Sequence, residues 1–151
     1  MGQRRMAREL ALQTLYSAEM RGEPVGTVLQ DVSGWRHYSR KALEYATELA
    51  SNVLRYEKEC NRLIEETVEH WELSRIALLD RIILRMGICE ILYSNDIPPR
   101  VAIDEAIELA KKYSTEKSGG FINGILDTIL KRKISEQASG DEQSSSCDGR
   151  R

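Results

Sequence analysis

Three arginines near the start of the chain have the type and spacing of a phosphate-binding cluster. Arg4, Arg5 and Arg8 fall in the first turns of a helix predicted over Arg4–Arg21 and are expected to project together, away from any acid except Glu9. Cations at the start of a helix oppose its dipole, at a cost of about 0.3–1 kcal/mol each. Guanidinium groups suit phosphate oxygens, so the cluster suggests a nucleic-acid contact. A charged helix end that faces only solvent is the alternative.

A second group of this kind lies in and just after the segment Ser114–Gly120. Ser118 is placed to cap a following helix, which would leave the backbone N–H groups of residues 119–121 pointing out of the helix end. Together with the ammonium of Lys117, these groups could bind an anion, and the Phe121 ring could stack on a base. The alternative is a capped turn in which Phe121 and Ile122 belong to the core.

These groups have to be positioned by a central helix, predicted over Ser74–Tyr93. Apolar residues occupy nearly all of its sides, so other helices must surround it, and it is too short and too charged to span a membrane. Gly87, and Gly124 in the last helix, mark close approaches by other helices. Glu90 lies in the apolar arc and needs a partner, because an unpaired buried carboxylate is costly.

Arg81 and Arg85 of the same helix carry like charges one turn apart, which is mildly destabilising. Acids of the next helix are expected to neutralise them: Asp104, Glu105 and Glu108.

Helical periodicity predicts an all-α fold in one domain. Besides the two helices above, the expected helices are Pro24–Val32, a segment from Tyr38 through Trp71 with a bend around Glu57–Asn61, Val101–Tyr113 and Phe121–Lys133. Residues 134–151 are polar and rich in serine, without periodicity, and are expected to form a disordered tail.

The composition excludes several classes of function. The net charge of -2 over 151 residues gives no general attraction to nucleic acid, so such binding needs a local basic patch. The three cysteines, Cys60, Cys89 and Cys147, lack metal-site spacing and indicate reduced thiols, and neither His37 nor His70 belongs to a ligand motif. No signal peptide, catalytic motif or cofactor motif is recognisable, which predicts a cytoplasmic helical binding module without metal or cofactor.

Three stretches of the chain together resemble the NusB family of transcription antitermination factors. They are ARELALQTLY near the start, LLDRIILRMGICEILY followed by DIPPRVAIDEAIELAKKYS, and SGGFINGILDTIL. The likeness runs from about Arg4 to Leu130. It implies two antiparallel helical halves packed together, about seven helices in all, with a NusB-like RNA-binding domain over residues 1–133.

The resemblance also implies a function and its residues. Members bind the boxA element of ribosomal RNA leader transcripts together with NusE, a small-subunit ribosomal protein, in a complex with RNA polymerase and other Nus factors that suppresses premature termination. By position, the RNA contacts would be Arg4, Arg5, Arg8, Lys117, Ser118, Phe121 and Asn123, and the partner contacts Tyr16 and Asp80. Met6 and Gly120 replace residues that are often basic in the family, so this chain alone could bind RNA more weakly and depend more on NusE.

Three other functions are open to a helical chain of this kind. A NusB-like domain also precedes ribosomal RNA cytosine methyltransferases, but this chain carries no cofactor-binding motif. A helical scaffold that binds only protein, for example as a homodimer, would have no affinity for boxA. A helix-turn-helix DNA-binding protein would carry its basic residues along a recognition helix rather than at a helix end and a loop.

Overall fold

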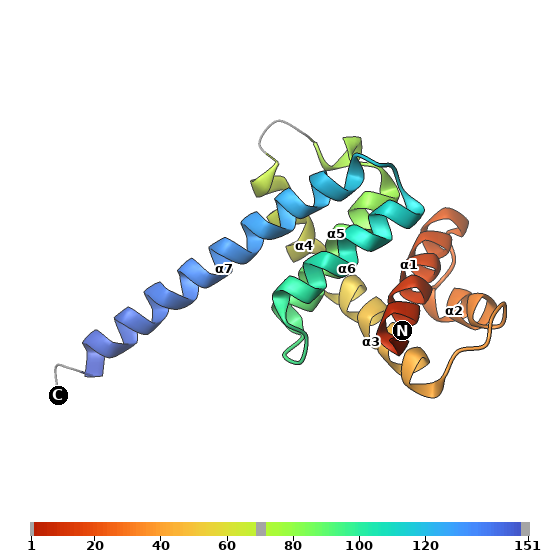
Figure 1. The fold of residues 1–151 in the computed structure, drawn as a ribbon, viewed down its shortest axis with the longest axis horizontal. Helices are drawn as coiled ribbons and strands as arrows, with labels where there is room; N and C mark the ends of the chain where they lie inside the picture. The colour runs from red at the N-terminus through yellow and green to blue at the C-terminus, as the bar shows by residue number, and fades with distance from the viewer. Residues whose placement is uncertain (1, 69–71, 149–151) are drawn as a thin grey trace.

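The computed structural model describes residues 2–68 and 72–148, with side chains up to residue 139. Within these ranges the chain forms seven α-helices and no strand, which confirms the predicted all-α fold (Figure 1). The helices are α1 (Gln3–Arg21), α2 (Val25–Ser33), α3 (Arg40–Arg55), α4 (Glu57–Thr67), α5 (Leu78–Tyr93), α6 (Pro99–Tyr113) and α7 (Ser118–Asp148), and a 3-10 turn, Leu73–Arg75, precedes α5.

The first half of the molecule is a bundle of α1, α2 and α3. α1 packs mainly against α3 and α2, and it ends at Gly22, whose φ of 67° is in the left-handed region that glycine adopts without strain. Ser39 caps α3 by accepting a hydrogen bond from the Ala42 N–H. The bend predicted near residue 57 is present as a break at Tyr56, which separates α3 from α4.

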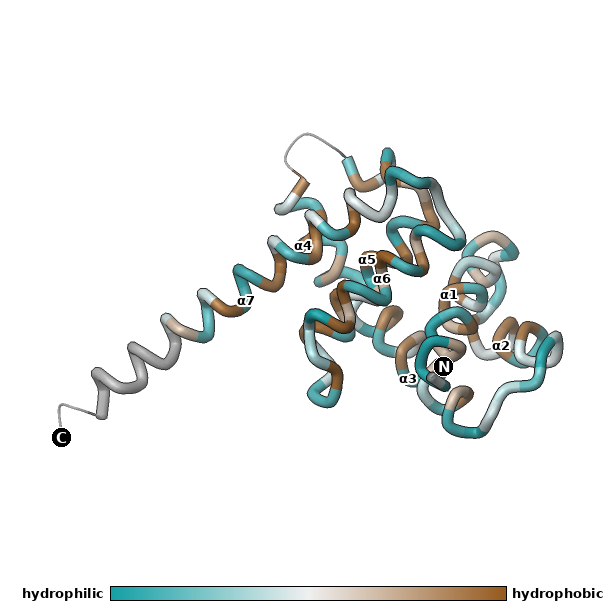
Figure 2. The backbone as a smooth tube through the Cα atoms, in the orientation of Figure 1, coloured by the Kyte–Doolittle hydropathy of each residue, from teal (hydrophilic) through white to brown (hydrophobic). Residues whose placement is uncertain are grey.

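The second half is built around α5, as the sequence predicted. Every residue from Ile82 to Ile91 of this helix is buried, and five helices pack against it: α1, α3, α4, α6 and α7. The colouring of Figure 2 alternates between hydrophobic and hydrophilic along α7, as expected of a helix with one buried face. The buried residues of that face include Ile122, Leu126 and Ile129.

Only one of the two predicted close approaches at glycine is present. A Cβ placed on Gly87 would lie 2.8 Å from Leu126 Cδ1, so α5 and α7 approach closely there. Nothing lies within 4 Å of a Cβ placed on Gly124, and the prediction for that residue is wrong. Gly124 faces away from the neighbouring helices, on the exposed side of α7.

The expected pairing of Arg85 with acids of the next helix is also wrong. Arg85 Nε donates to Asn61 Oδ1 at 2.9 Å, and its Nη1 lies 3.7 Å from a Glu57 carboxylate oxygen. Both partners belong to α4. Burial lowers the pKa of Arg85, while the charge of Glu57 opposes that shift.

Residues 134–148, expected to be disordered, continue α7 as helix (Figure 1). Adding residues to an existing helix does not require a new helix nucleation step, so a polar segment can continue the helix. The side chains of residues 134–139 are all exposed, and α7 projects beyond the other helices in this part. The predicted boundary of the packed domain at residue 133 stays a prediction. In the part of the chain described here, no helix has the length and apolar character needed to cross a membrane.

Candidate nucleic-acid and protein interface

The amino end of α1 presents two arginines to solvent, each beside an acid. Arg4 Nη2 lies 2.6 Å from Asp96 Oδ2, and its side chain is 47% exposed. Arg5 donates to both carboxylate oxygens of Glu105, at 3.2 and 2.9 Å. The expectation that this cluster lies away from acids is therefore wrong, because the loop before α6 and α6 itself supply them. Both arginines remain accessible, and exposed ion pairs of this kind exchange easily for phosphate.

Arg8 lies one turn further along α1 and is buried, so it does not project with the other two. Its Nε lies 3.0 and 2.9 Å from the two Glu90 carboxylate oxygens, with only 5% of the Arg8 side chain and 3% of the Glu90 side chain exposed. The Tyr45 hydroxyl also donates to Glu90. Burial raises the pKa of Glu90, and the positive charge of Arg8 opposes this shift. Glu90 thus has the partner that its position required.

A pocket of about 360 Å³ brings together several predicted residues from the second group. Lys117, Ser118 and Phe121 of that group line it, together with Asp80, a predicted partner contact, and with residues 75–77 and 114–115. Asp80 is 8% exposed, and its Oδ1 accepts no hydrogen bond from the described residues. This oxygen is covered in the structure, so a ligand's N–H or O–H would reach it only after a small movement of the pocket wall.

Ser118 contributes differently from the prediction, because its side chain does not cap the helix. Its Oγ donates to Asp80 Oδ2 at 3.0 Å, and α7 already begins at this residue. The Phe121 N–H donates to the Lys117 carbonyl at 3.3 Å, so that amide is used within the helix. Ser118 therefore connects the start of α7 to the start of α5.

The remaining predicted residues lie around this pocket and along α1. Phe121 is partly buried, lining the pocket while packing against the core, and Ile122 is wholly buried. Lys117 and Asn123 are exposed, whereas Tyr16 is partly buried on α1.

The two groups lie toward opposite ends of α6, along the edge where α6 meets α1. Arg5 meets Glu105 in the middle of α6, Lys112 Nζ lies 2.6 Å from Glu9 near its end, and Gln13 donates to the Tyr113 hydroxyl at 3.3 Å. The segment with Ser118 follows directly. Lys112, which is exposed, stands between the two groups and is a candidate phosphate contact that the sequence reasoning missed.

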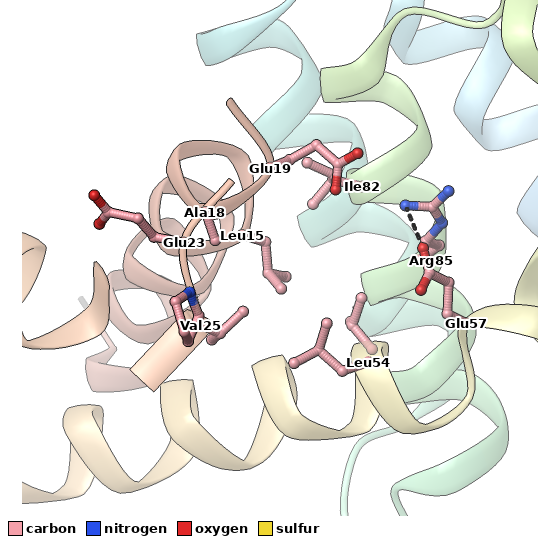
Figure 3. Close-up of a pocket in the computed structure, with 11 residues that line it drawn as sticks. Leu15, Ala18, Glu19, Glu23, Val25, Leu54, Glu57, Ile82 and Arg85 are labelled. Carbon is pink, nitrogen blue, oxygen red and sulfur yellow. Dashed lines mark ion pairs between the residues drawn. The ribbon is translucent and has the colours of Figure 1, made fainter. Parts of the chain in front are cut away.

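A separate groove of about 270 Å³ lies between α1, α3 and α5 (Figure 3). Its floor is apolar, with Leu15 and Ile82, and the carboxylates of Glu19 and Glu23 stand near its edge. The residues that line it are different from those predicted from the sequence. Among the described residues, no group of His, Cys, Asp or Glu side chains has an arrangement that could hold a metal ion.

Comparison with known proteins gives one consistent answer. The model of the NusB family matches residues 5–131. The transcription antitermination protein NusB of Desulfosudis oleivorans is 44% identical over 134 residues, which are 87% of each chain.

Solved structures agree with the sequence matches. The NusB structure from T. maritima superposes with a TM-score of 0.79 at 39% identity, covering 85% of this chain and 90% of that one. A crystal structure of antitermination factors NusB and NusE with double-stranded RNA superposes with a TM-score of 0.78 at 31% identity, covering 86% of this chain and 97% of that one. The fold, the matched span and these relatives together show that this chain belongs to the NusB family.

Proposed function

We propose that this protein binds single-stranded boxA RNA of ribosomal RNA leader transcripts together with NusE, and that the complex suppresses premature termination by RNA polymerase. As a member of the NusB family it is a transcription antitermination factor and not an enzyme. The relative whose structure contains NusB, NusE and RNA supports both partners. Other Nus factors and the polymerase would join through this complex, in the cytoplasm.

The observation that carries the proposal is the edge formed by α1 and α6. Exposed cations stand at its two ends, Arg4 and Arg5 at one and Lys117 at the other, with Lys112 between them. A strand of RNA laid along this edge would meet a positive group at each end and between the ends. Spaced single cations favour an extended strand, because successive phosphates can each find a partner.

Base recognition is assigned to the pocket end of that edge. Phe121 offers part of its ring at the pocket, and Asn123 is exposed two residues further along α7. Aromatic stacking and amide hydrogen bonds are the usual means of reading unpaired bases. The backbone at Ser118 adds polar groups beside them. The burial of Arg8 disfavours a direct RNA contact, so its predicted contact is replaced by a positioning role: it holds α1 on α5.

NusE is assigned to Tyr16 on α1 and to Asp80, which lies at the start of α5 in the wall of the same pocket. Asp80 has a buried carboxylate oxygen without a donor, and Tyr16 is partly exposed on α1. A partner that brings an N–H or O–H to Asp80 would satisfy that oxygen. Such a contact gives specificity, because a partner lacking the donor would leave the carboxylate unpaired.

Fluorescence anisotropy of labelled boxA RNA tests the proposal, with a scrambled RNA as control and with NusE present or absent. We expect binding to boxA over the scramble, strengthened by NusE. Equal binding of both RNAs in both conditions would refute the proposal and favour a scaffold that binds only protein, for which size-exclusion chromatography with light scattering would report a homodimer.

The salt dependence of boxA binding tests the arginines separately. Four phosphate contacts, at Arg4, Arg5, Lys112 and Lys117, predict a slope of log affinity against log salt of about -2.8, and Arg4 with Arg5 contribute about -1.4 of this. The variant Arg4→Ala/Arg5→Ala should lose affinity and flatten the slope by that amount. An unchanged slope would show that these two side chains do not contact phosphate.

A further inference from the structure

The interface between α4 and α5 contains two cysteines whose sulfur atoms touch. Cys60 Sγ lies 3.9 Å from Cys89 Sγ, both residues have 0% exposed surface, and both are free thiols. The two positions are 29 residues apart in sequence, so only the packing of the helices brings them together.

The contacts on either side hold these helices in an antiparallel register. One turn before Cys60 and one turn after Cys89, the rings of Tyr56 and Tyr93 stack with centroids 3.7 Å apart. On the other side, Arg85 Nε donates to Asn61 Oδ1 at 2.9 Å. With a contact on each side, the two sulfur atoms face each other at a fixed position along the interface.

The surroundings give the two thiols different roles. A hydrogen bond from Cys89 and the nearby charge of Arg85 lower the pKa of Cys60, while the pKa of Cys89 is raised by the same hydrogen bond and by burial. The charge of Arg85 favours Cys60 as the thiol that attacks first, which leaves Cys89 to complete the exchange. A disulfide requires the sulfur atoms to come to about 2.05 Å, a closing movement of about 1.9 Å from the observed contact.

We propose that Cys60 and Cys89 are a site of oxidative modification, at which a small disulfide such as glutathione disulfide closes an intramolecular bond between α4 and α5. The Cys60 thiolate attacks glutathione disulfide, which forms a mixed disulfide and releases one glutathione thiolate. Cys89 then attacks the Cys60 sulfur and releases the second glutathione. Two protein thiols are oxidised, one glutathione disulfide is reduced to two glutathione molecules, and the two thiol protons pass to them.

The oxidant reaches the pair through local opening of α4. This helix has 11 residues, and only Cys60 and Ile64 of it are buried. Short elements with few buried residues open at lower free energy than the whole protein, so the thiols become accessible without global unfolding. Once formed, the bond ties α4 to the central helix and raises the thermal midpoint by about 5–10 °C, because it restricts the unfolded chain.

The test uses the full chain with the substitution Cys147→Ser, which leaves only the two buried thiols. The folded protein is incubated with glutathione disulfide, and its intact mass and disulfide-linked peptides are measured. We expect the loss of two hydrogens and a peptide joining Cys60 to Cys89. The variants Cys60→Ala and Cys89→Ala, each in the same background, should never lose two hydrogens.

Two results would overturn the proposal. One is folded protein that keeps both thiols or stops at a glutathione adduct; the other is a bond that forms only when the same protein is first unfolded in urea. Either would mean that the native packing does not support the bond. The result does not depend on RNA or NusE, so this test and the test of the proposed function can fail separately.

Discussion

Replacement of Arg8 by alanine should be among the most destabilising single changes in this protein. The change removes the cation that lies 2.9–3.0 Å from both oxygens of Glu90, in a place where 3% of the Glu90 side chain is exposed. Loss of one member of a buried ion pair costs about 3–5 kcal/mol, because the other charge is left without compensation. For a chain of this size that cost lowers the thermal midpoint by about 6–20 °C.

Arg4→Ala is the matched control, because it removes the same group from the same helix. The Arg4 pair with Asp96 is exposed, so its loss should cost no more than about 1 kcal/mol. Urea unfolding at neutral pH would measure both variants. If Arg8→Ala and Arg4→Ala cost the same within error, the buried pair does not contribute as the structure indicates.

The pH dependence of the same variant gives a second check. Burial raises the pKa of Glu90 above its ordinary 4.5, so the folded protein keeps this proton at a pH where the unfolded chain has lost it. Stability from this group is therefore present below pH 4.5 and falls as the pH rises through the raised pKa. Without Arg8 the pKa of Glu90 is raised further, because the charge that opposed the shift is gone. The loss of unfolding free energy caused by Arg8→Ala should therefore be larger at neutral pH than at pH 4.5. A cost independent of pH would contradict this account.

The other predictions concern α5, α7 and the pocket. Gly87→Ala should destabilise the protein by about 1 kcal/mol in urea unfolding, because the new methyl group would press on fully buried Leu126. Gly124→Ala should stabilise it by about 0.5–1 kcal/mol, because nothing lies close to a Cβ at that position. The reverse order would contradict the packing of α5 on α7. Phe121→Leu should weaken boxA binding by about 1–3 kcal/mol in anisotropy while keeping the fold, and unchanged affinity would exclude stacking. Asp80→Asn should weaken NusE binding by about 1.5–3 kcal/mol in calorimetry, and equal affinity would remove Asp80 from that interface.

The sequence predicted the helices well because each one is specified by its own periodicity. The apolar sides of α5 showed that it is central, and the position of Glu90 showed that it needed a partner. The identity of that partner could not be predicted, because Arg8 is 82 residues away in sequence. A helical wheel places side chains on a face of one helix and says nothing about what other helices bring to it.

The same limit explains the errors at the candidate site. The sequence of α1 predicts that Arg4 and Arg5 lie away from acids, yet Asp96 and Glu105 reach them from 92 and 100 residues away. Ser118 fits the local pattern of a helix cap, but α7 already begins at this residue, and the Phe121 N–H bonds to the Lys117 carbonyl instead of to the Ser118 hydroxyl.

The hydrogen bond between Ser118 and Asp80 joins a residue assigned to RNA with a residue assigned to NusE. If each ligand changes the position or polarity of its own member of this pair, it changes the free energy of binding at the other. Thermodynamic linkage then requires symmetry: the factor by which NusE tightens boxA binding equals the factor by which boxA tightens NusE binding. One side-chain contact of 3.0 Å would thereby make assembly of the complex cooperative, and Ser118→Ala would reduce both factors equally.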